Sequence, residues 1–270
     1  MKLSKITIGG IIGIVILAFW IFMAIFGSML TPYTHVEMDL VQKMAAPSAS
    51  HILGTDQLGR DIFSRIIIGS RSVLTVSVTA ALFSTFLGIL VGFSAGYFGG
   101  KTDEIIMRFM DILLSMPALV LAMVVVGIME GTSILTLTLV ISIVFTPRTA
   151  RVARSALLTW KDLEFVDAAK IRGESHLYIM FMEIMPNALG PIIVEATARI
   201  AYSVMTVSAL GFLGIGLQPP TPDWGMMVSE NKSIIISAPW AVLAPTIAIA
   251  SLVIGVSLLA DLIQRRLINE

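Results

Sequence analysis

Six long apolar segments, separated by shorter polar connections, run through this chain. Each reaches the roughly 20 helical residues that are needed to cross the hydrocarbon core of a bilayer. The pattern predicts an all-α membrane protein with six transmembrane helices, at about residues 6–29, 73–97, 105–129, 133–152, 188–217 and 238–263. Composition agrees, because 56% of the 270 residues are hydrophobic and only 13% are charged, which is too apolar for an ordinary soluble domain.

The first apolar segment invites comparison with a secretory signal, because Lys2 and Lys5 precede it. Its apolar run of about 24 residues is longer than the ~7–15 residues of a signal core, and no small-x-small cleavage site follows closely. We therefore expect residues 1–34 to form an uncleaved first membrane helix that starts in the cytoplasm.

A long charge-bearing segment separates the fourth and fifth apolar segments, at residues 155–187. Its density of charge predicts that it lies in water. Within it we expect a short amphipathic helix, capped by Asp162 and ended by Gly173, because a left-handed C-terminal residue is most favourable without a Cβ atom. A second helix is expected over residues 175–185 and should stop at Pro186, which cannot donate the helical hydrogen bond.

The connection of residues 35–71, expected on the outer side, contains the string Gly-Thr-Asp56-Gln-Leu-Gly-Arg60-Asp61. By residue type it predicts an interfacial helix, capped by Thr55 or Asp56, with Asp61 and the arginines paired along one face. The alternative is that Asp56, Arg60 and Asp61 contact a substrate or a partner protein outside the membrane. Both interpretations fit the sequence.

A second outer connection, residues 218–225, contains three prolines in the string Gln-Pro-Pro-Thr-Pro-Asp-Trp-Gly. Proline cannot continue a helix, so we expect a rigid loop that holds Trp224 at the membrane interface, where it is available for an extracytoplasmic contact. A short surface helix is expected over residues 229–237.

Two pairs of opposite charges fall inside the apolar segments. Arg108 and Asp111 are three residues apart near the start of the third segment, which predicts mutual pairing near the boundary, and Pro117 should kink this helix. Glu195 and Arg199 are four residues apart in the fifth segment, in the favourable acid-before-base order. That pair is either a structural ion pair or a lining of a transport pathway.

Charge also predicts the orientation of the chain. Six spans with both termini in the cytoplasm place most basic residues on the cytoplasmic side, in agreement with the positive-inside rule. The basic residues assigned to that side are Lys2, Lys5, Lys101, Arg108, Arg148, Arg151, Arg154, Lys161, Lys170, Arg172, Arg265 and Arg266. Four basic residues in 31–71 are an exception, and four acidic residues in the same connection balance them.

Several kinds of chemistry are not indicated. The formal net charge is zero, so no nucleic-acid footprint is visible, and the chain has no cysteine for disulfides or thiolate metal sites. His35, His51 and His176 are widely separated and suggest no metal site. The 16 methionines lie mostly in apolar runs, where they are expected to fill gaps between helices. We therefore expect no catalytic residues, no metal site and no cofactor on this chain.

The segment that ends in Gly99-Gly100-Lys101-Thr102 is a near miss to a phosphate-binding loop. Ala95 occupies the position of the first glycine, and a long apolar helix precedes it where a phosphate-binding loop needs a strand. Helix capping by Gly99 and Gly100 is the better interpretation. Any ATP hydrolysis would then belong to another chain.

The charged segment carries a specific resemblance. The order Asp167-Ala168-Ala169, then Gly173, then Met-Pro186 resembles the cytoplasmic "EAA" loop of permease subunits of bacterial binding-protein-dependent ABC importers. Asp167 stands for the usual Glu, Glu183 replaces an apolar residue or His, and Met185 replaces Leu. The resemblance implies a coupling helix seated in a groove of an ATPase subunit, with contacts from Glu164, Asp167, Ala168, Ala169, Arg172, Gly173 and Pro186.

The Gly-Thr-Asp-x-x-Gly-Arg-Asp string resembles the second permease subunit of the dipeptide, oligopeptide and nickel branch of this family. This implies a type I importer fold with a permease core over residues 72–264, in the bacterial cytoplasmic membrane. It also implies a second homologous permease, two ATPase subunits that bind ATP and Mg²⁺, and an extracytoplasmic solute-binding protein. Peptides, nickel and metal-chelator complexes all remain candidate substrates.

Two other functions remain open at this point. An ion-gradient-driven secondary transporter usually has several ionisable residues near the midplane or paired broken helices. This chain has one self-paired Glu195 and Arg199 and a large polar loop, which favours the ATP-driven importer. A membrane scaffold without transport activity is the third alternative.

Overall fold

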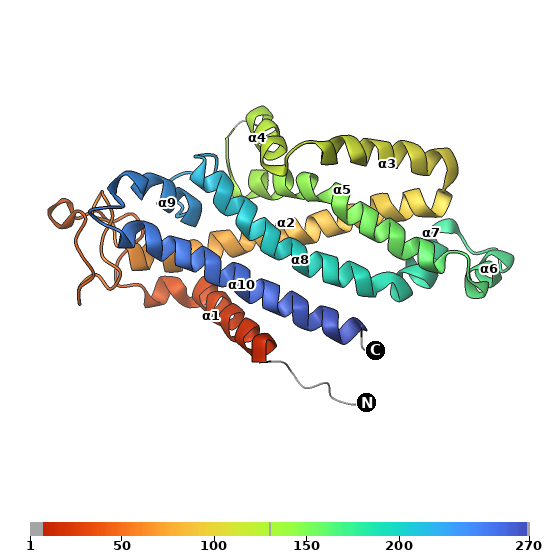
Figure 1. Ribbon diagram of the computed structural model, residues 1–270, viewed down its shortest axis with the longest axis horizontal. Helices are drawn as coiled ribbons and strands as arrows, with labels where there is room; N and C mark the ends of the chain where they lie inside the picture. Colours follow the sequence, from red (N-terminus) through yellow and green to blue (C-terminus); the bar gives the residue numbers. More distant parts are fainter. Residues whose placement is uncertain (1–7, 130, 269–270) are drawn as a thin grey trace.

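The computed structural model describes residues 8–129 and 131–268, and helices make up its regular structure there (Figure 1). The longer helices are α1 (Ile8–Leu30), α2 (Ile62–Phe98), α3 (Gly100–Ser115), α4 (Ala118–Ile128), α5 (Ile134–Trp160), α8 (Met185–Phe212) and α10 (Trp240–Ile268). The short ones are η1 (Leu40–Gln42), α6 (Glu164–Ile171), α7 (His176–Tyr178), the π-helical η2 (Ile179–Ile184), α9 (Trp224–Asn231) and η3 (Lys232–Ile234). Residues 6 and 7 of the predicted first span, with Lys2 and Lys5, lie outside the described residues.

The helices confirm the all-α membrane class. Within residues 8–129 and 131–268, five helical segments are long and apolar enough to cross a membrane: α1, α2, α5, α10 and the continuous segment from α7 to the end of α8. The pair α3 and α4 also passes when counted together, although the two are bent by 96°. The predicted number of six spans is reached when this bent pair is counted as one.

The expected kink at Pro117 is in fact a break between two helices. Met116 ends α3 with an extended backbone, at ψ 138°, and α4 begins only at Ala118. A residue that precedes proline is driven out of the helical region by contact with the proline ring. This local effect extends over two residues here, so the predicted third span is not one straight helix.

The second span begins earlier than predicted. Ile62 starts α2, and Asp61 is its N-cap, because its Oδ2 atom accepts a hydrogen bond of 2.7 Å from the backbone N–H of Ser64. The expected cap at Thr55 or Asp56 is therefore wrong, and no separate interfacial helix carries Arg65, which lies in the first turn of α2 itself. Because polar residues interrupt the first turns of α2, the hydrophobic pattern alone did not show that the helix begins at Ile62.

Close contact between α2 and α5 forms the centre of the bundle. Gly88, Gly92 and Gly96 lie along one face of α2, and a Cβ atom built on Gly92 would come within 2.2 Å of the backbone oxygen of Ala150. Small residues let two backbones approach, which strengthens van der Waals packing where lipid offers no hydrophobic driving force. On the other side of the bundle, α1 packs against α10 at Gly13.

The bundle has two chemically different ends, which we name by the short helix at each. The α6 end holds α6, α7 and the start of α3, and the α9 end holds α9 and residues 31–61 (Figure 1). Helix α1 begins, and α10 ends, on the side that faces the α6 end (Figure 1).

At the α9 end, Trp224 is buried among other residues and is not exposed for the extracytoplasmic contact that the sequence suggested. Its side chain is 0% exposed, its indole Nε1 donates to the backbone oxygen of Ile66 at 2.9 Å, and its ring lies 4.7 Å from that of Trp20. Trp224 opens α9, which Asp223 caps by accepting a hydrogen bond from the N–H of Met226. Burial raises the pKa of the Asp223 carboxyl. The helix predicted over residues 229–237 is therefore shifted: α9 begins at Trp224 and ends at Asn231.

We predict that Gly92→Val prevents the close packing of α2 against α5. The added side chain meets backbone rather than a flexible side chain, and overpacking typically costs ~1–3 kcal/mol. Detergent-extracted protein should melt at a lower temperature, or be lost to aggregation, in size-exclusion and thermal-stability assays. Gly127→Ala in α4 is the matched control, since nothing lies within 4 Å of the added Cβ. Equal stability of Gly92→Val and the wild type would contradict this packing.

Candidate functional site

Helix α6 is seated on the ends of longer helices by a small apolar face. Its Val166 and Ala169 are 0% exposed and join a cluster with Phe93 of α2, Leu157 of α5 and Ile184 of η2. The opposite face of α6 is exposed, and its residues include Leu163 at the N-cap, Glu164, Asp167, Ala168, Lys170 and Ile171. The helix is therefore held firmly from beneath and presents a mixed apolar and charged surface outward.

Both ends of α6 are defined by local geometry. Leu163 is its N-cap and offers no side-chain hydrogen bond, so the predicted cap at Asp162 is wrong. The predicted end at Gly173 is confirmed, with φ +78°. The N–H of Gly173 donates to Lys170 and that of Glu174 donates to Ala169, which is the Schellman pattern of a helix end.

The predicted stop at Pro186 is wrong, because the chain runs without a break from α7 through η2 into α8. The N–H of Met185 donates to the carbonyl of Met180, five residues back, as a π-helix requires. Pro186 follows at the first turn of α8, and a helix start tolerates the missing N–H of proline. The wider π turn therefore lets the helix continue past the proline.

Hydrogen bonds fasten the α6 segment to the end of α2. Lys161 donates through Nζ to the backbone oxygen of Gly96 at 2.9 Å, and the hydroxyl of Tyr97 lies 3.0 Å from Nδ1 of His176. These contacts were not predicted from sequence, because they join residues more than 60 positions apart.

Charged residues also pair within the α6 segment. Arg172 binds Glu183 at 2.6 Å, which gives a structural reason for an acid at position 183. Lys170 donates to Asp167 at 2.8 Å, and this hydrogen bond raises the pKa of Lys170. Solvent reaches both pairs, so they hold the charged side chains in place and add little to the stability of the fold.

Arg199 and Glu195 pair within α8 as predicted, with 2.9 Å between Nε and Oε1. The side chain of Arg199 is 3% exposed and that of Glu195 is 13% exposed. The guanidinium of Arg199 also lies over two aromatic rings, at 4.4 Å from the centroid of Tyr202 and 5.2 Å from that of Phe145. The pair is thus largely withdrawn from the surface of this chain.

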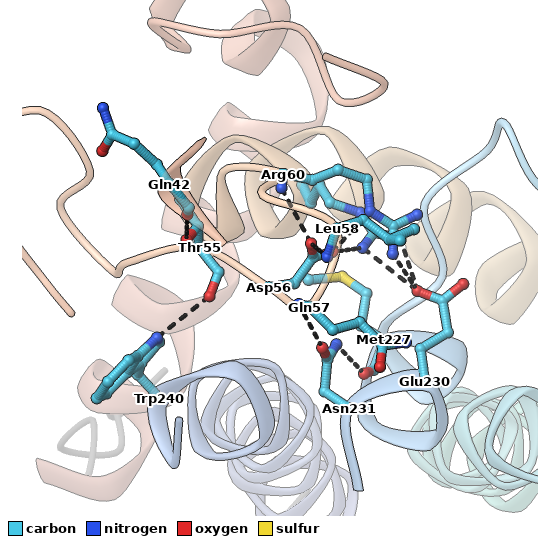
Figure 2. A network of polar contacts seen from close by, with 11 residues as sticks. Gln42, Thr55, Asp56, Gln57, Leu58, Arg60, Met227, Glu230, Asn231 and Trp240 are labelled. Carbon is cyan, nitrogen blue, oxygen red and sulfur yellow. Dashed lines mark hydrogen bonds and ion pairs between the residues drawn. The ribbon is translucent and has the colours of Figure 1, made fainter. Parts of the chain in front are cut away.

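The residues of the Gly-Thr-Asp string form a buried polar network at the α9 end (Figure 2). Asp56 accepts hydrogen bonds of 2.6 Å from both Arg60 and Arg65, and Arg60 reaches Glu230 of α9 at 2.6 Å. The backbone also requires the second glycine of the string. Gly59 has φ +75°, and a Cβ atom there would lie 1.9 Å from the carbonyl oxygen of Asp39.

Further bonds tie the same network to the rest of the α9 end. The backbone N–H of Gln57 donates to Asn231, and the indole of Trp240 donates to the carbonyl of Thr55 (Figure 2). Asp61 caps α2 and also contacts Nδ1 of His51 at 2.9 Å. Asp56, Arg60, Asp61 and Trp224 are between 0% and 6% exposed, so these side chains form very little of the surface, and Arg60 reaches it in the lining of a pocket.

A row of ion pairs between α3 and α5 was missed from sequence. Arg154 binds Asp103 at 2.6 Å through Nε, and Arg151 pairs with Asp111. The expected pair of Arg108 with Asp111 is therefore wrong, and Arg108 lies 4.0 Å from Glu104 instead. Spacing along one helix favoured the local pair, but α5 brings a closer cation to Asp111. The described residues contain no group of acidic and histidine side chains that fits a metal ion.

Comparison with known proteins assigns this chain to a family. Residues 88–269 match the family described as "Binding-protein-dependent transport system inner membrane component". The dipeptide transport system permease protein of Alkalihalophilus pseudofirmus is 39% identical over 97% of this chain and 84% of its own length. That of Escherichia coli K12 is 39% identical over 94% and 86%. The glutathione transport system permease protein of Pectobacterium atrosepticum is 36% identical over 92% and 80%.

Members of this family are multi-pass proteins of the inner membrane and serve transport rather than catalysis. They bind no cofactor of their own, since ATP is hydrolysed by partner subunits, and they work with a binding protein and a paired permease. The family match covers well over half of the chain, and the relatives span nearly all of it. This chain belongs to the family of inner membrane components of binding-protein-dependent transport systems.

Proposed function

We propose that this chain is one of two homologous permease subunits of an ATP-driven importer for small peptides, and that the two form the translocation pathway together. Support for the substrate class comes from relatives whose names specify dipeptide or glutathione transport and which align with more than nine-tenths of the chain. These relatives give no specific support to nickel or metal chelates. The seat of α6 on the ends of α2, α5 and η2 carries the proposal that import is driven by ATPase subunits.

The proposed orientation places the α6 end, and both chain termini, in the cytoplasm. Arg154, Lys161 and Lys170 lie at that end, in keeping with the positive-inside rule. The α9 end would then face the extracytoplasmic binding protein. Two ATPase subunits, one below each permease, complete the proposed assembly.

The coupling surface is the outward face of α6. Ala168 is exposed and small, and Ile171 is 87% exposed, so a groove on an ATPase can receive this face. Asp167, Glu164 and Arg172 supply charges at its edges. Val166 and Ala169 face the opposite way, so a force applied to α6 is passed to the helices beneath it.

Two routes carry that force onward. The hydrogen bonds of Lys161 and His176 reach the end of α2, while Gly173 leads the chain into α7, η2 and α8. The π-helical segment before Pro186 has longer-range hydrogen bonds than an α-helix, which makes it the place where α8 can change its register. Motion of α2 and α8 together would open and close the pathway.

We predict that Ala168→Arg uncouples ATP hydrolysis from import. A long charged side chain on the outward face of α6 would clash with an ATPase groove but leaves the buried face intact. Reconstituted complexes should lose at least about tenfold in binding-protein-stimulated uptake, measured as labelled peptide inside proteoliposomes. Thr102→Arg in α3 is the control, since it adds the same charge to an exposed position at the same end of the bundle but outside α6. Normal uptake by Ala168→Arg would show that α6 is not the coupling surface.

We predict that Tyr97→Phe lowers the uptake obtained per ATP hydrolysed. The variant removes one hydrogen bond to His176, and such a bond is worth ~0.5–1.5 kcal/mol, so a change of about two- to tenfold is expected. Adding His176→Phe should cause no further loss, because both changes break the same contact. Tyr178→Phe is the matched control on an exposed tyrosine with no hydroxyl contact among the described residues. Additive losses would contradict a shared role.

We also predict that this chain alone transports nothing in response to an ion gradient. Glu195 is the only acidic residue within α8, and its pairing with Arg199 leaves it poorly suited to carry protons. The measurement is peptide uptake by proteoliposomes that hold the purified chain, under a proton or sodium gradient and without ATPase subunits. Uptake under those conditions would favour the secondary-transporter alternative.

A further inference from the structure

An exposed arginine faces the Glu195–Arg199 pair across one aromatic ring. The guanidinium of Arg148, on α5, lies 5.9 Å from the centroid of the Tyr202 ring, and that of Arg199 lies 4.4 Å from the same centroid. Tyr202 is 45% exposed, and Arg148 is exposed between buried neighbours. Two cations thus share one ring on the seam between α5 and α8.

Arg148 differs from the next arginines along its helix. Arg151 and Arg154 follow at intervals of three residues, and each has an acidic partner on α3. Among the residues that the structure describes, Arg148 has no acidic partner, and its interaction with the Tyr202 ring is a cation–π contact. Its positive charge therefore has no acidic partner there, whereas Arg151 and Arg154 each have one.

The group formed by Arg148, Glu195 and Arg199 therefore carries a net positive charge. Arg148 and Arg199 contribute two positive charges, while Glu195 contributes one negative charge that already pairs with Arg199 at 2.9 Å. Both arginines lie near the middles of their helices, α5 and α8. A charge facing hydrocarbon is costly, so charged side chains in membrane helices face a protein partner or a water-filled path.

A cavity lies beside this cluster. It has a volume of about 410 Å³ and is lined by Glu195, Gly190 and Pro191 of α8, Val152 of α5 and the end of α10. Glu195 of the ion pair lines this cavity, and Val152 is four residues from Arg148 along α5, whereas Arg148, Arg199 and Tyr202 lie outside the lining. Its volume falls within the ~300–1,000 Å³ of sites that hold small molecules.

We propose that Arg148, with the Tyr202 ring and the Arg199–Glu195 pair behind it, forms a carboxylate-binding station for the peptide in transit. The inference rests on the proposed import of peptides, whose free C-terminus is a carboxylate. A guanidinium presents paired donors to a carboxylate, and the Tyr202 ring holds that guanidinium in place. Glu195 keeps the charge of Arg199 balanced while the station is empty.

The test uses the complete transporter in proteoliposomes with its binding protein and labelled L-alanyl-L-alanine as the probe. We expect Arg148→Gln to lower uptake per ATP hydrolysed by about tenfold or more, because the variant loses hydrogen bonds between two charged groups. ATP hydrolysis stimulated by the loaded binding protein should stay within about twofold of the wild type. Arg148→Lys should retain much of the uptake, since it keeps the charge.

Arg151→Gln is the matched control. It removes the same charged group one turn away on α5, where Asp111 already occupies the guanidinium. We expect its uptake per ATP to match that of the wild type. Equal loss in both variants would show that the total positive charge of α5 matters, and it would overturn the carboxylate station.

A second variant fills the station without removing the arginine. Val152→Glu places a carboxylate one turn from Arg148, and it should lower uptake per ATP as Arg148→Gln does. Val152→Gln, which has nearly the same shape but no charge, should have a much smaller effect. Equal effects of the two substitutions would also overturn the proposal.

Other occupants of the station predict different results. If Arg148 binds an acidic residue of the second permease, Arg148→Gln should release that subunit during purification. If it binds the headgroup of an anionic lipid, the loss should appear in phosphatidylglycerol vesicles and disappear in vesicles of zwitterionic phosphatidylcholine. Either result overturns the station, as does normal uptake by Arg148→Gln. A wild-type complex that hydrolyses ATP but imports no L-alanyl-L-alanine would instead overturn the peptide assignment and remove the basis of the station.

Discussion

Apolar contact between α6 and the helices beneath it is the interaction on which the proposed coupling of this chain to an ATPase depends. Val166 and Ala169 are fully buried, and their partners come from α2, α5 and η2. A short helix of eight residues has little stability of its own in water, so it needs this tertiary contact to form at all. The same contact turns its exposed face into a surface that is mechanically connected to the membrane helices.

Two contacts of side chains reinforce the attachment of the α6 segment to α2. Lys161 bonds to backbone, not to another flexible side chain, and the Tyr97–His176 contact joins two ring systems of limited freedom. The π-helical segment, in contrast, lies between α7 and α8 where the hydrogen-bond pattern changes. A rigid attachment to α2 beside an adaptable entry to α8 is the arrangement expected of a two-state element.

Charge is distributed along the bundle according to the surroundings of each group. At the α9 end, Asp56, Arg60 and Arg65 are buried and pair with one another and with Glu230, so they hold residues 31–61 against α9. Near the middle, Glu195 and Arg199 form a largely buried pair, because an isolated charge would be costly there. At the α6 end, the pairs of Lys170 with Asp167 and of Arg172 with Glu183 lie at the surface and add little stability.

Sequence by itself determined the helical class, the apolar segments, the helix end at Gly173 and the Glu195–Arg199 pair, because each depends on residues close together in the chain. Only the tertiary structure decided the burial of Trp224, the partner of Asp111 and the passage of the helix through Pro186. Those outcomes depend on which distant helix lies opposite a residue, or on the choice between α- and π-type hydrogen bonds. Hydrophobic periodicity and residue spacing carry no information about either.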